Sequence, residues 1–260
     1  MIKRSLVIIA VVLCATFFAV NYAVSVGPGN LTAATGGPNK HNLSVSGPGP
    51  HKALGETQIC IFCHTPHKAT VSIPLWNHTL SAATYTLPSS ATQKSVPSNP
   101  PDGSSRLCLS CHDGTVPLGS VQNFGGPPTI IPMGGGALTG PSNMGTNISG
   151  HHLVSIELPA TLNAAKAAEC QSLTIAWNVR IPSNITASWT PLQPTNNSFG
   201  GSLTKKGVQC TSCHDPHMDN PVGGAFIKAA SRGSWTTRGY TAALCLACHC
   251  QCPGGGLNCQ

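Results

Sequence analysis

Charged residues are scarce in this sequence. Asp, Glu, Lys and Arg together make up 8% of its 260 residues, whereas ordinary soluble domains contain about 25%. A protein surface with so few charges tends to self-associate, so the shortage favours a protein that assembles with copies of itself or is covered by glycan. Six N-x-S/T sequons could accept a glycan, at Asn30, Asn42, Asn77, Asn147, Asn184 and Asn196.

Aromatic residues are also few, at 5% of the chain, whereas glycine and proline occur 28 and 22 times. Stretches rich in these residues, at 27–50, 97–103 and 125–150, interrupt the chain too often for long helices. We therefore expect a mostly irregular fold with short helices. Because large apolar side chains are few, we expect bound cofactors to fill much of the core.

Long hydrophobic runs are absent except near the N-terminus. One apolar run extends from Leu6 to Val20, after Lys3 and Arg4, and it is shorter than the ~20 residues that cross a bilayer. It is followed by Ala23-Val24-Ser25, a small-x-small cleavage sequence. This pattern predicts a signal peptide at 1–25, and hence an exported protein without a permanent membrane anchor.

Clusters of basic residues are absent as well. Lys and Arg outnumber Asp and Glu by 14 to 7, for a formal net charge of +7, but they form no basic patch and no stripe interleaved with aromatic residues. Nucleic acid is therefore excluded as a partner.

Cysteine, by contrast, is abundant and occurs mainly in one repeated pentapeptide. The pattern C-x-x-C-H occupies 60–64, 108–112, 210–214 and 245–249, and it is the attachment signature of c-type haem. Zinc ribbons and thioredoxin-like sites also use C-x-x-C, but neither explains the His in every copy. We predict four covalent c-type haems, attached through Cys60, Cys63, Cys108, Cys111, Cys210, Cys213, Cys245 and Cys248, with His64, His112, His214 and His249 as proximal iron ligands.

Seven of the eleven histidines remain for the second axial position of these irons. His67 and His217 each follow a proximal His by three residues, too near to reach the opposite face of the same haem, so we expect them to ligate the neighbouring haem of each pair. Two axial imidazoles leave no open position on iron, which favours electron transfer over catalysis. The predicted distal ligands are His41, His67, His152 and His217, with His78 as the alternate.

The motif spacing divides the chain into regions. The first and second motifs lie 48 residues apart, the second and third 102, and the third and fourth 35. We expect a first two-haem unit at 26–120, a non-haem insert at 121–205 and a second two-haem unit with a cysteine-rich tail at 206–260. Within the insert, 159–170 suits a helix, while the alternation over 172–181 and the segment 185–189 suit strands.

Four cysteines outside the motifs are expected to form disulfides after export. Three pairings are open. The residues are Cys170, Cys250, Cys252 and Cys259.

Several runs of sequence resemble a known family. The chain resembles doubled C-x-x-C-H multihaem c-type cytochromes. The runs that carry the resemblance are Lys40-His-Asn-Leu-Ser, Cys60-Ile-Phe-Cys-His-Thr-Pro-His with Pro74-Leu-Trp-Asn-His, and Cys210-Thr-Ser-Cys-His-Asp-Pro-His. With four haems, the chain is most similar to the tetrahaem extracellular cytochrome nanowires (OmcE-like). The resemblance covers roughly 38–120 and 205–249. It implies a continuous stack of haems, in parallel and T-shaped pairs, with little regular secondary structure.

The resulting expectation is extracellular electron transfer by hopping along four bis-His haems in a head-to-tail filament, rather than an enzyme. Redox partners and extracellular electron acceptors would complete the pathway. A monomeric periplasmic shuttle and a multihaem reductase subunit are the alternatives. In the filament, the arm at 27–50 could reach a neighbour, where His41 or His78 would ligate a haem of the adjacent subunit.

Overall fold

The computed structural model describes residues 31, 39–69, 74–90, 93, 96–158, 192–195 and 206–219, and the backbone of 177–179 and 249–251. Most of this part of the chain is irregular. Its helices are α2 (Gly103–His112), the single turn α4 (Cys210–Cys213) and the 3-10 turns η3 (Cys60–Phe62) and η4 (Gly140–Ser142).

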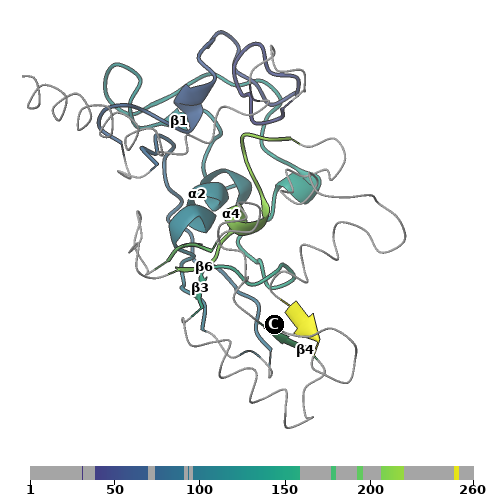
Figure 1. Ribbon diagram of the computed structural model, residues 1–260. Coiled ribbons are helices and arrows are strands. Elements are labelled where there is room, and N and C mark those ends of the chain that lie inside the picture. The colour runs from purple at the N-terminus through teal and green to yellow at the C-terminus, as the bar shows by residue number, and fades with distance from the viewer. Residues whose placement is uncertain are drawn as a thin grey trace, which may run out of the picture.

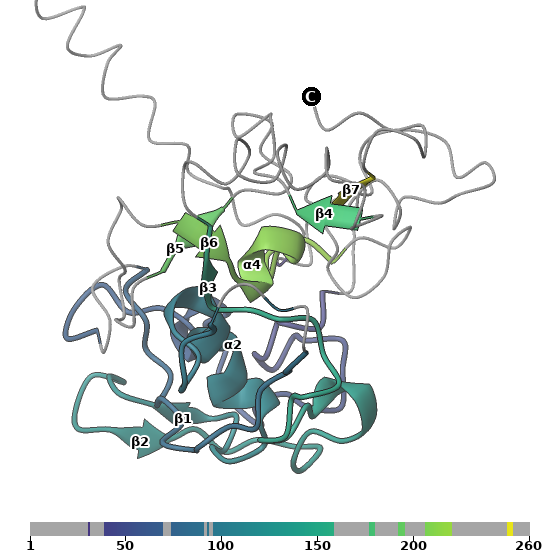
Figure 2. The same ribbon diagram turned by 90° about the horizontal axis from the view of Figure 1, so that it is seen from below.

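Three small antiparallel sheets accompany these helices. In the first, β1 (Ser120–Val121) pairs with β2 (Thr129–Ile130). The second has the order β3-β6-β5, built from Ile156–Glu157, Lys206–Val208 and Gln193–Pro194. In the third, β4 (Trp177–Val179) pairs with β7 (His249–Gln251). Figures 1 and 2 show β1 and β4 near opposite ends, with α2 and α4 side by side between them.

The backbone is thus mostly coil with short helices and small sheets, and β4 lies inside the segment 172–181 that was expected to be a strand. The helix expected at 159–170 and the strand at 185–189 lie outside the described residues. The strands of the insert do not stay within it, because β3 and β5 both pair with β6, which leads into the third motif.

Helix α2 ends at the second motif for a local reason. The backbone N–H of Asp113 donates to the carbonyl oxygen of Leu109 at 2.9 Å, which closes the last turn. Gly114 then adopts a left-handed conformation with φ +73°, which commonly ends a helix. A Cβ at Gly114 would lie 2.8 Å from the Asn143 side chain. His112 is therefore held at the helix C-terminus.

The apolar core consists of three small clusters, and each lies at one of the first three motifs. Phe62 of the first motif packs with Ala53, Val121 and Ile131. Leu109, inside the second motif, packs with Tyr85 and Ile148. Val208, two residues before the third motif, packs with Leu158 and Leu192.

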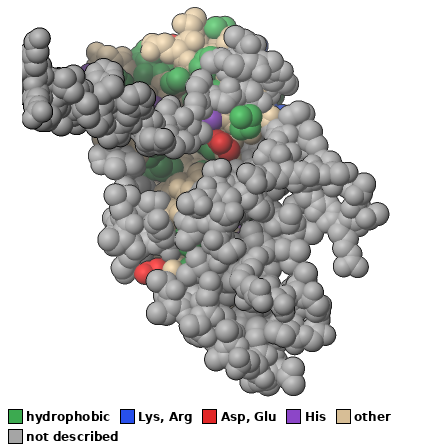
Figure 3. Space-filling view, viewed as in Figure 1, with side chains coloured by type: hydrophobic (Ala, Val, Ile, Leu, Met, Phe, Trp, Pro, Cys, Tyr) green, Lys and Arg blue, Asp and Glu red, His purple; other side chains and the backbone are tan. Residues whose placement is uncertain are grey.

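Polar side chains occupy much of the remaining interior. Asn77 is fully buried, and its amide nitrogen donates to the carbonyl oxygens of Ile61 at 2.6 Å and Asn123 at 3.0 Å. Its Oδ1 accepts from the backbone N–H of Asn123 at 2.8 Å. Buried polar groups must be hydrogen-bonded in this way to be tolerated. The surface is also poor in charge, and few charged side chains are visible among the described atoms in Figure 3.

Asp113 is the acceptor of a second buried network. The Tyr85 hydroxyl donates to Oδ2 at 2.6 Å, and the N–H and hydroxyl of Thr115 each donate to Oδ1 at 2.8 Å. Burial alone would raise the pKa of Asp113, but hydrogen bonds from Ser81, Tyr85 and Thr115 outweigh it and lower that pKa. Burial, and then the bond to Asp113, raise the pKa of Tyr85 to about 12.

We predict that Tyr85→Phe destabilises the protein at pH 7 by about 1.5–3 kcal/mol, the usual contribution of a hydrogen bond to a charged group. A carboxylate with a lowered folded-state pKa contributes stability above its unfolded pKa and loses it as pH falls through the folded value. The difference in the free energy of unfolding between the variant and the wild type should therefore be smaller at pH 3 than at pH 7. Denaturant unfolding at both pH values measures it, and an equal difference at the two would contradict the ionic character of this bond.

Candidate functional site

Each of the three described C-x-x-C-H motifs places its cysteines on one helical turn. In the first, the N–H groups of Cys63 and His64 donate to the carbonyl oxygen of Cys60 at 3.1 and 2.8 Å. The second motif forms the last turn of α2, and the third forms α4. Residues three apart on a helix lie on the same face, so the two thiols of each motif project to one side.

The three motifs also converge. The side chains of Cys108 and Cys210 are near enough to shift each other's titration: the interaction lowers the pKa of Cys210 to about 7 and raises the pKa of Cys108. Burial raises the pKa of Cys111, and the nearby Cys63 raises it further. Cysteines of the first, second and third motifs therefore lie in one region, and within the described part of the chain Cys60, Cys63, Cys108, Cys111 and Cys210 form no disulfide.

His64, the predicted proximal ligand of the first motif, faces His217 of the third-motif segment. Their ring centroids are 6.1 Å apart and their planes differ by 23°. The Nδ1–H of His64 donates to the carbonyl oxygen of Pro74 at 2.7 Å. The Trp76 ring packs edge-on at 6.2 Å. Burial lowers the pKa of His64, so this ring is neutral at pH 7.

His112, the predicted proximal ligand of the second motif, faces His41. Their ring centroids are 6.0 Å apart and their planes differ by 87°. The Nδ1 of His112 donates to the carbonyl oxygen of Ser142 at 2.7 Å. Burial, and next the neighbouring His112, lower the pKa of His41 to about 4, so His41 is also neutral at pH 7.

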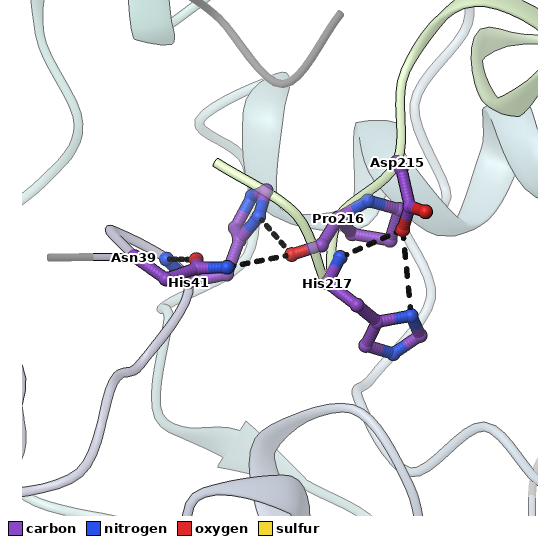
Figure 4. Close-up of polar contacts among 5 residues, drawn as sticks. All are labelled: Asn39, His41, Asp215, Pro216 and His217. Atoms are coloured by element: carbon purple, nitrogen blue, oxygen red, sulfur yellow. Dashed lines mark hydrogen bonds and ion pairs between the residues drawn. The ribbon is translucent and has the colours of Figure 1, made fainter. Parts of the chain in front are cut away.

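The segment Asp215-Pro216-His217 orients both of these partner rings (Figure 4). The Nδ1 of His41 lies 3.1 Å from the carbonyl oxygen of Pro216. Asp215 Oδ1 accepts from the backbone N–H of His217 at 3.0 Å and lies 3.6 Å from its Nδ1. The backbone of His41 is fixed as well, because its N–H donates to Asn39 Oδ1 at 2.8 Å.

This geometry suits a metal held between two imidazoles. With a nitrogen–metal bond of about 2 Å and a ring nitrogen about 1.1 Å from the ring centre, two imidazoles on opposite sides of one metal have centroids about 6 Å apart. A carbonyl oxygen only accepts, so each ring bonded to one carries its proton on Nδ1 and a lone pair on Nε2. Ligating histidines typically have such a second hydrogen bond. The ring separations and the Nδ1 hydrogen bonds therefore match what two imidazole ligands of one haem iron would need.

Two of the predicted distal ligands, His41 and His217, are thus brought to predicted proximal ligands. His217 was expected to ligate the neighbouring haem of its own two-haem unit. In the structure its ring instead faces His64 of the first two-haem unit. His67 is exposed, and among the described residues its ring meets no other predicted ligand. His152 is exposed, with Nδ1 2.8 Å from the carbonyl oxygen of Leu153.

His78, the alternate ligand, lies in the interior. Its side chain is fully buried, and its Nε2 donates to the carbonyl oxygen of Ser110 at 3.2 Å. The Trp76 ring packs edge-on at 6.5 Å. Burial lowers the pKa of His78 to about 4. Its Nε2 is engaged by a backbone carbonyl of α2, and its Nδ1 is buried without a hydrogen-bond partner among the described residues.

The third and fourth motifs are described less completely. His214 is exposed and close enough to His41 to lower the pKa of that ring. Only the backbone of His249 and Cys250 is described, in β7 opposite Val179 and Asn178. The remaining predicted residues lie outside the described part of the chain: the signal peptide at 1–25, Cys245, Cys248, Cys170, Cys252 and Cys259.

Sequence reasoning missed the groups that orient the rings. Pro74 and Ser142 contribute only backbone carbonyl oxygens. Every residue has such an oxygen, so these acceptors cannot be recognised from the residue type. Asp215 and Pro216 had a signal, because they lie inside the extended pattern C-x-x-C-H-x-P-H that singled out His217.

No protein family model matches this sequence, and no curated protein matches it either. In the part of the chain that the structure describes, no helix combines the length and apolar character needed to cross a bilayer. No group of three or more His, Cys, Asp or Glu side chains there is arranged to hold a metal ion. A haem iron needs only two protein ligands, since the porphyrin supplies the other four.

We predict that His78→Gln flattens the dependence of stability on pH. The folded-state pKa of His78 is about 4 against an ordinary 6.5, so the unfolded state takes up the proton first and stability falls between those pH values. The loss is on the order of 3 kcal/mol. Denaturant unfolding at pH 7, 5.5 and 4 measures the slope. The exposed His151→Gln is the control, and an unchanged slope in His78→Gln would refute the prediction.

Proposed function

We propose that this chain is a multihaem c-type cytochrome that transfers electrons through four covalent haems with two axial imidazoles on each iron. The observation that carries the proposal is the pairing of His64 with His217 and of His112 with His41, at centroid separations of 6.1 and 6.0 Å. The lowered pKa values of His64 and His41 and the Nδ1 hydrogen bonds of His64, His112 and His41 support it. The helical turn at each described motif supports covalent attachment through its two thiols.

Under this proposal the residues of the chain have separate roles. The cysteines of each motif attach the porphyrin, and the following His ligates its iron. His217 supplies the sixth ligand at the first motif, and His41 supplies it at the second. Haem, when bound, provides one-electron iron chemistry, and the protein tunes it through ligand identity, hydrogen bonding and burial.

An electron carrier is favoured over an enzyme by the same two pairs. A second imidazole fills the axial position that a substrate would need. The fully buried His78 and the edge-on Trp76 close the region behind His64. We therefore infer transfer without substrate binding at the first two motifs.

We further propose that the protein acts outside the cell as a homopolymeric filament. Support comes from the low charge of the chain and from large apolar side chains left exposed, including Val96 at 90%, Leu54 at 69% and Ile130 at 59%. His41 faces His112 of its own chain and His78 is fully buried, so this proposal does not use either of them as an inter-subunit ligand.

The first test of the proposal is haem content. Mass spectrometry of the mature protein should show four haem additions that survive acid-acetone extraction, because thioether bonds are covalent. Three or fewer in a fully matured sample would reject the stoichiometry, and none would reject the function.

The second test addresses the axial pairs. His217→Ala should leave four haems attached but convert one low-spin iron to high-spin, because one imidazole is lost, and His41→Ala should do the same. Electron paramagnetic resonance of the oxidised protein measures this. His151→Ala, at an exposed histidine that is not a predicted ligand, is the control and should leave the spectrum unchanged. A fully low-spin spectrum of His217→Ala would contradict the pairing with His64.

The third test concerns assembly. Negative-stain electron microscopy of the native secreted protein should show filaments whose length falls when Leu54 and Ile130 are both replaced by Ser, since these side chains are exposed. A single species of monomer size in the wild-type material would favour the monomeric periplasmic shuttle instead.

A further inference from the structure

We infer that Ser105 and Gln209 are positioning residues that hold the second and third motifs in contact, so that the haems attached at Cys108 and Cys210 lie against each other. The inference rests on the proposed function. If the inference is right, electrons pass directly from the haem of the second motif to the haem of the third, although the two motifs lie 102 residues apart in the sequence.

One face of α2 carries the contact. Ser104 and Ser105 precede Cys108 by four and three residues, so all three side chains lie on the same side of the helix. Figures 1 and 2 show α2 lying beside α4. The Ser104 hydroxyl hydrogen-bonds the hydroxyl of Thr211, inside the third motif. The Ser105 Oγ accepts from the backbone N–H of Cys210 at 3.0 Å. Cys108 and Cys210 are then brought together at the next turn.

Gln209 locks this arrangement from the other side. It is 1% exposed, and its Oε1 accepts from both the hydroxyl and the backbone N–H of Ser105. Its Nε2 donates to Asp102 Oδ1 at 2.7 Å, at the start of α2. Its own backbone N–H donates to Ser212 Oγ at 3.0 Å, which caps α4. One side chain thus joins the first turn of α2 to the third motif.

A second layer holds Asp102 and Gln209 in place. The Thr195 hydroxyl donates to Asp102 Oδ2 at 2.8 Å. The Ser155 hydroxyl accepts from the backbone N–H of Asp102 at 3.0 Å. All of these side chains are at most 4% exposed. In such a buried network, a lost partner leaves other groups unsatisfied, so the network has one stable arrangement.

The contact between the second and third motifs determines how close the haems proposed at Cys108 and Cys210 would lie. Cys108 and Cys210 would each attach a porphyrin edge in the proposed protein, and the bonds from Ser104 to Thr211 and from the Cys210 N–H to Ser105 hold their helical turns against each other. Two porphyrins attached to adjoining turns would lie side by side. Electron transfer between them depends steeply on their separation, so Ser105 and Gln209 would set its rate without touching either haem.

The test compares Gln209→Met with wild type in the fully loaded protein. Met matches the length of Gln but removes the side-chain hydrogen bonds to Ser105, Ser155 and Asp102. Haem content is measured by pyridine haemochrome and mass, spin state by electron paramagnetic resonance, and haem proximity by circular dichroism, where adjacent haems give a split Soret band. We expect four low-spin haems with partial loss of the split band. Gln122→Met, which removes the bond from Gln122 to Thr79, is the matched control and should keep the band.

Each outcome decides between the alternatives. A wild-type band in Gln209→Met, or an equal loss in Gln122→Met, overturns the inference. If Gln209→Met fails to retain its haems, the milder Ser105→Ala decides: partial loss of the split band supports the inference and an unchanged band overturns it. A wild-type protein with four haems but no split band also overturns it and leaves the proposed function standing. Absence of covalent haem in the wild type rejects the proposed function itself.

Discussion

The hydrogen bond from an imidazole Nδ1 to a backbone carbonyl oxygen fixes the candidate site. It occurs at His64, His112 and His41, with the carbonyls of Pro74, Ser142 and Pro216 as acceptors. It sets the tautomer of each ring, with the proton on Nδ1 and a lone pair on Nε2. It also restricts rotation of each ring, so that the separations of about 6 Å between the facing rings are maintained.

The rest of the fold provides those carbonyls in the right positions with few apolar residues. Three small clusters anchor Phe62, Leu109 and Val208 at their motifs, and buried networks around Asn77, Asp113 and Gln209 join the segments between them. Such networks are directional, so they specify one arrangement where a loosely packed apolar core would allow several. A chain with few aromatic residues can hold a defined site in this way.

The local structure of the site was predictable from the sequence, but its long-range pairing was not. The C-x-x-C-H spacing predicts two thiols on one turn, and the structure has that turn at Cys60, Cys108 and Cys210. His41 and His217 could be selected as candidate ligands because of the motifs around them. Their partners could not, since His217 and His64 are 153 residues apart and only tertiary contacts bring them together. The insert likewise appeared separate in sequence, whereas β3 and β5 complete a sheet with β6.

The position of His217 in the chain has a consequence for the order in which the molecule can be completed. A protein exported from its N-terminus presents the first two motifs to the far side of the membrane well before the third. His64 then waits for a segment that arrives 153 residues later, since His217 faces its ring, whereas His41, the partner of His112, is already present and lacks only the Pro216 carbonyl that orients it. In the proposed cytochrome, the first motif would therefore lack its second protein ligand until that segment arrived. A chain truncated before 210 would lack this ligand permanently, and the pairing at the first motif could not form.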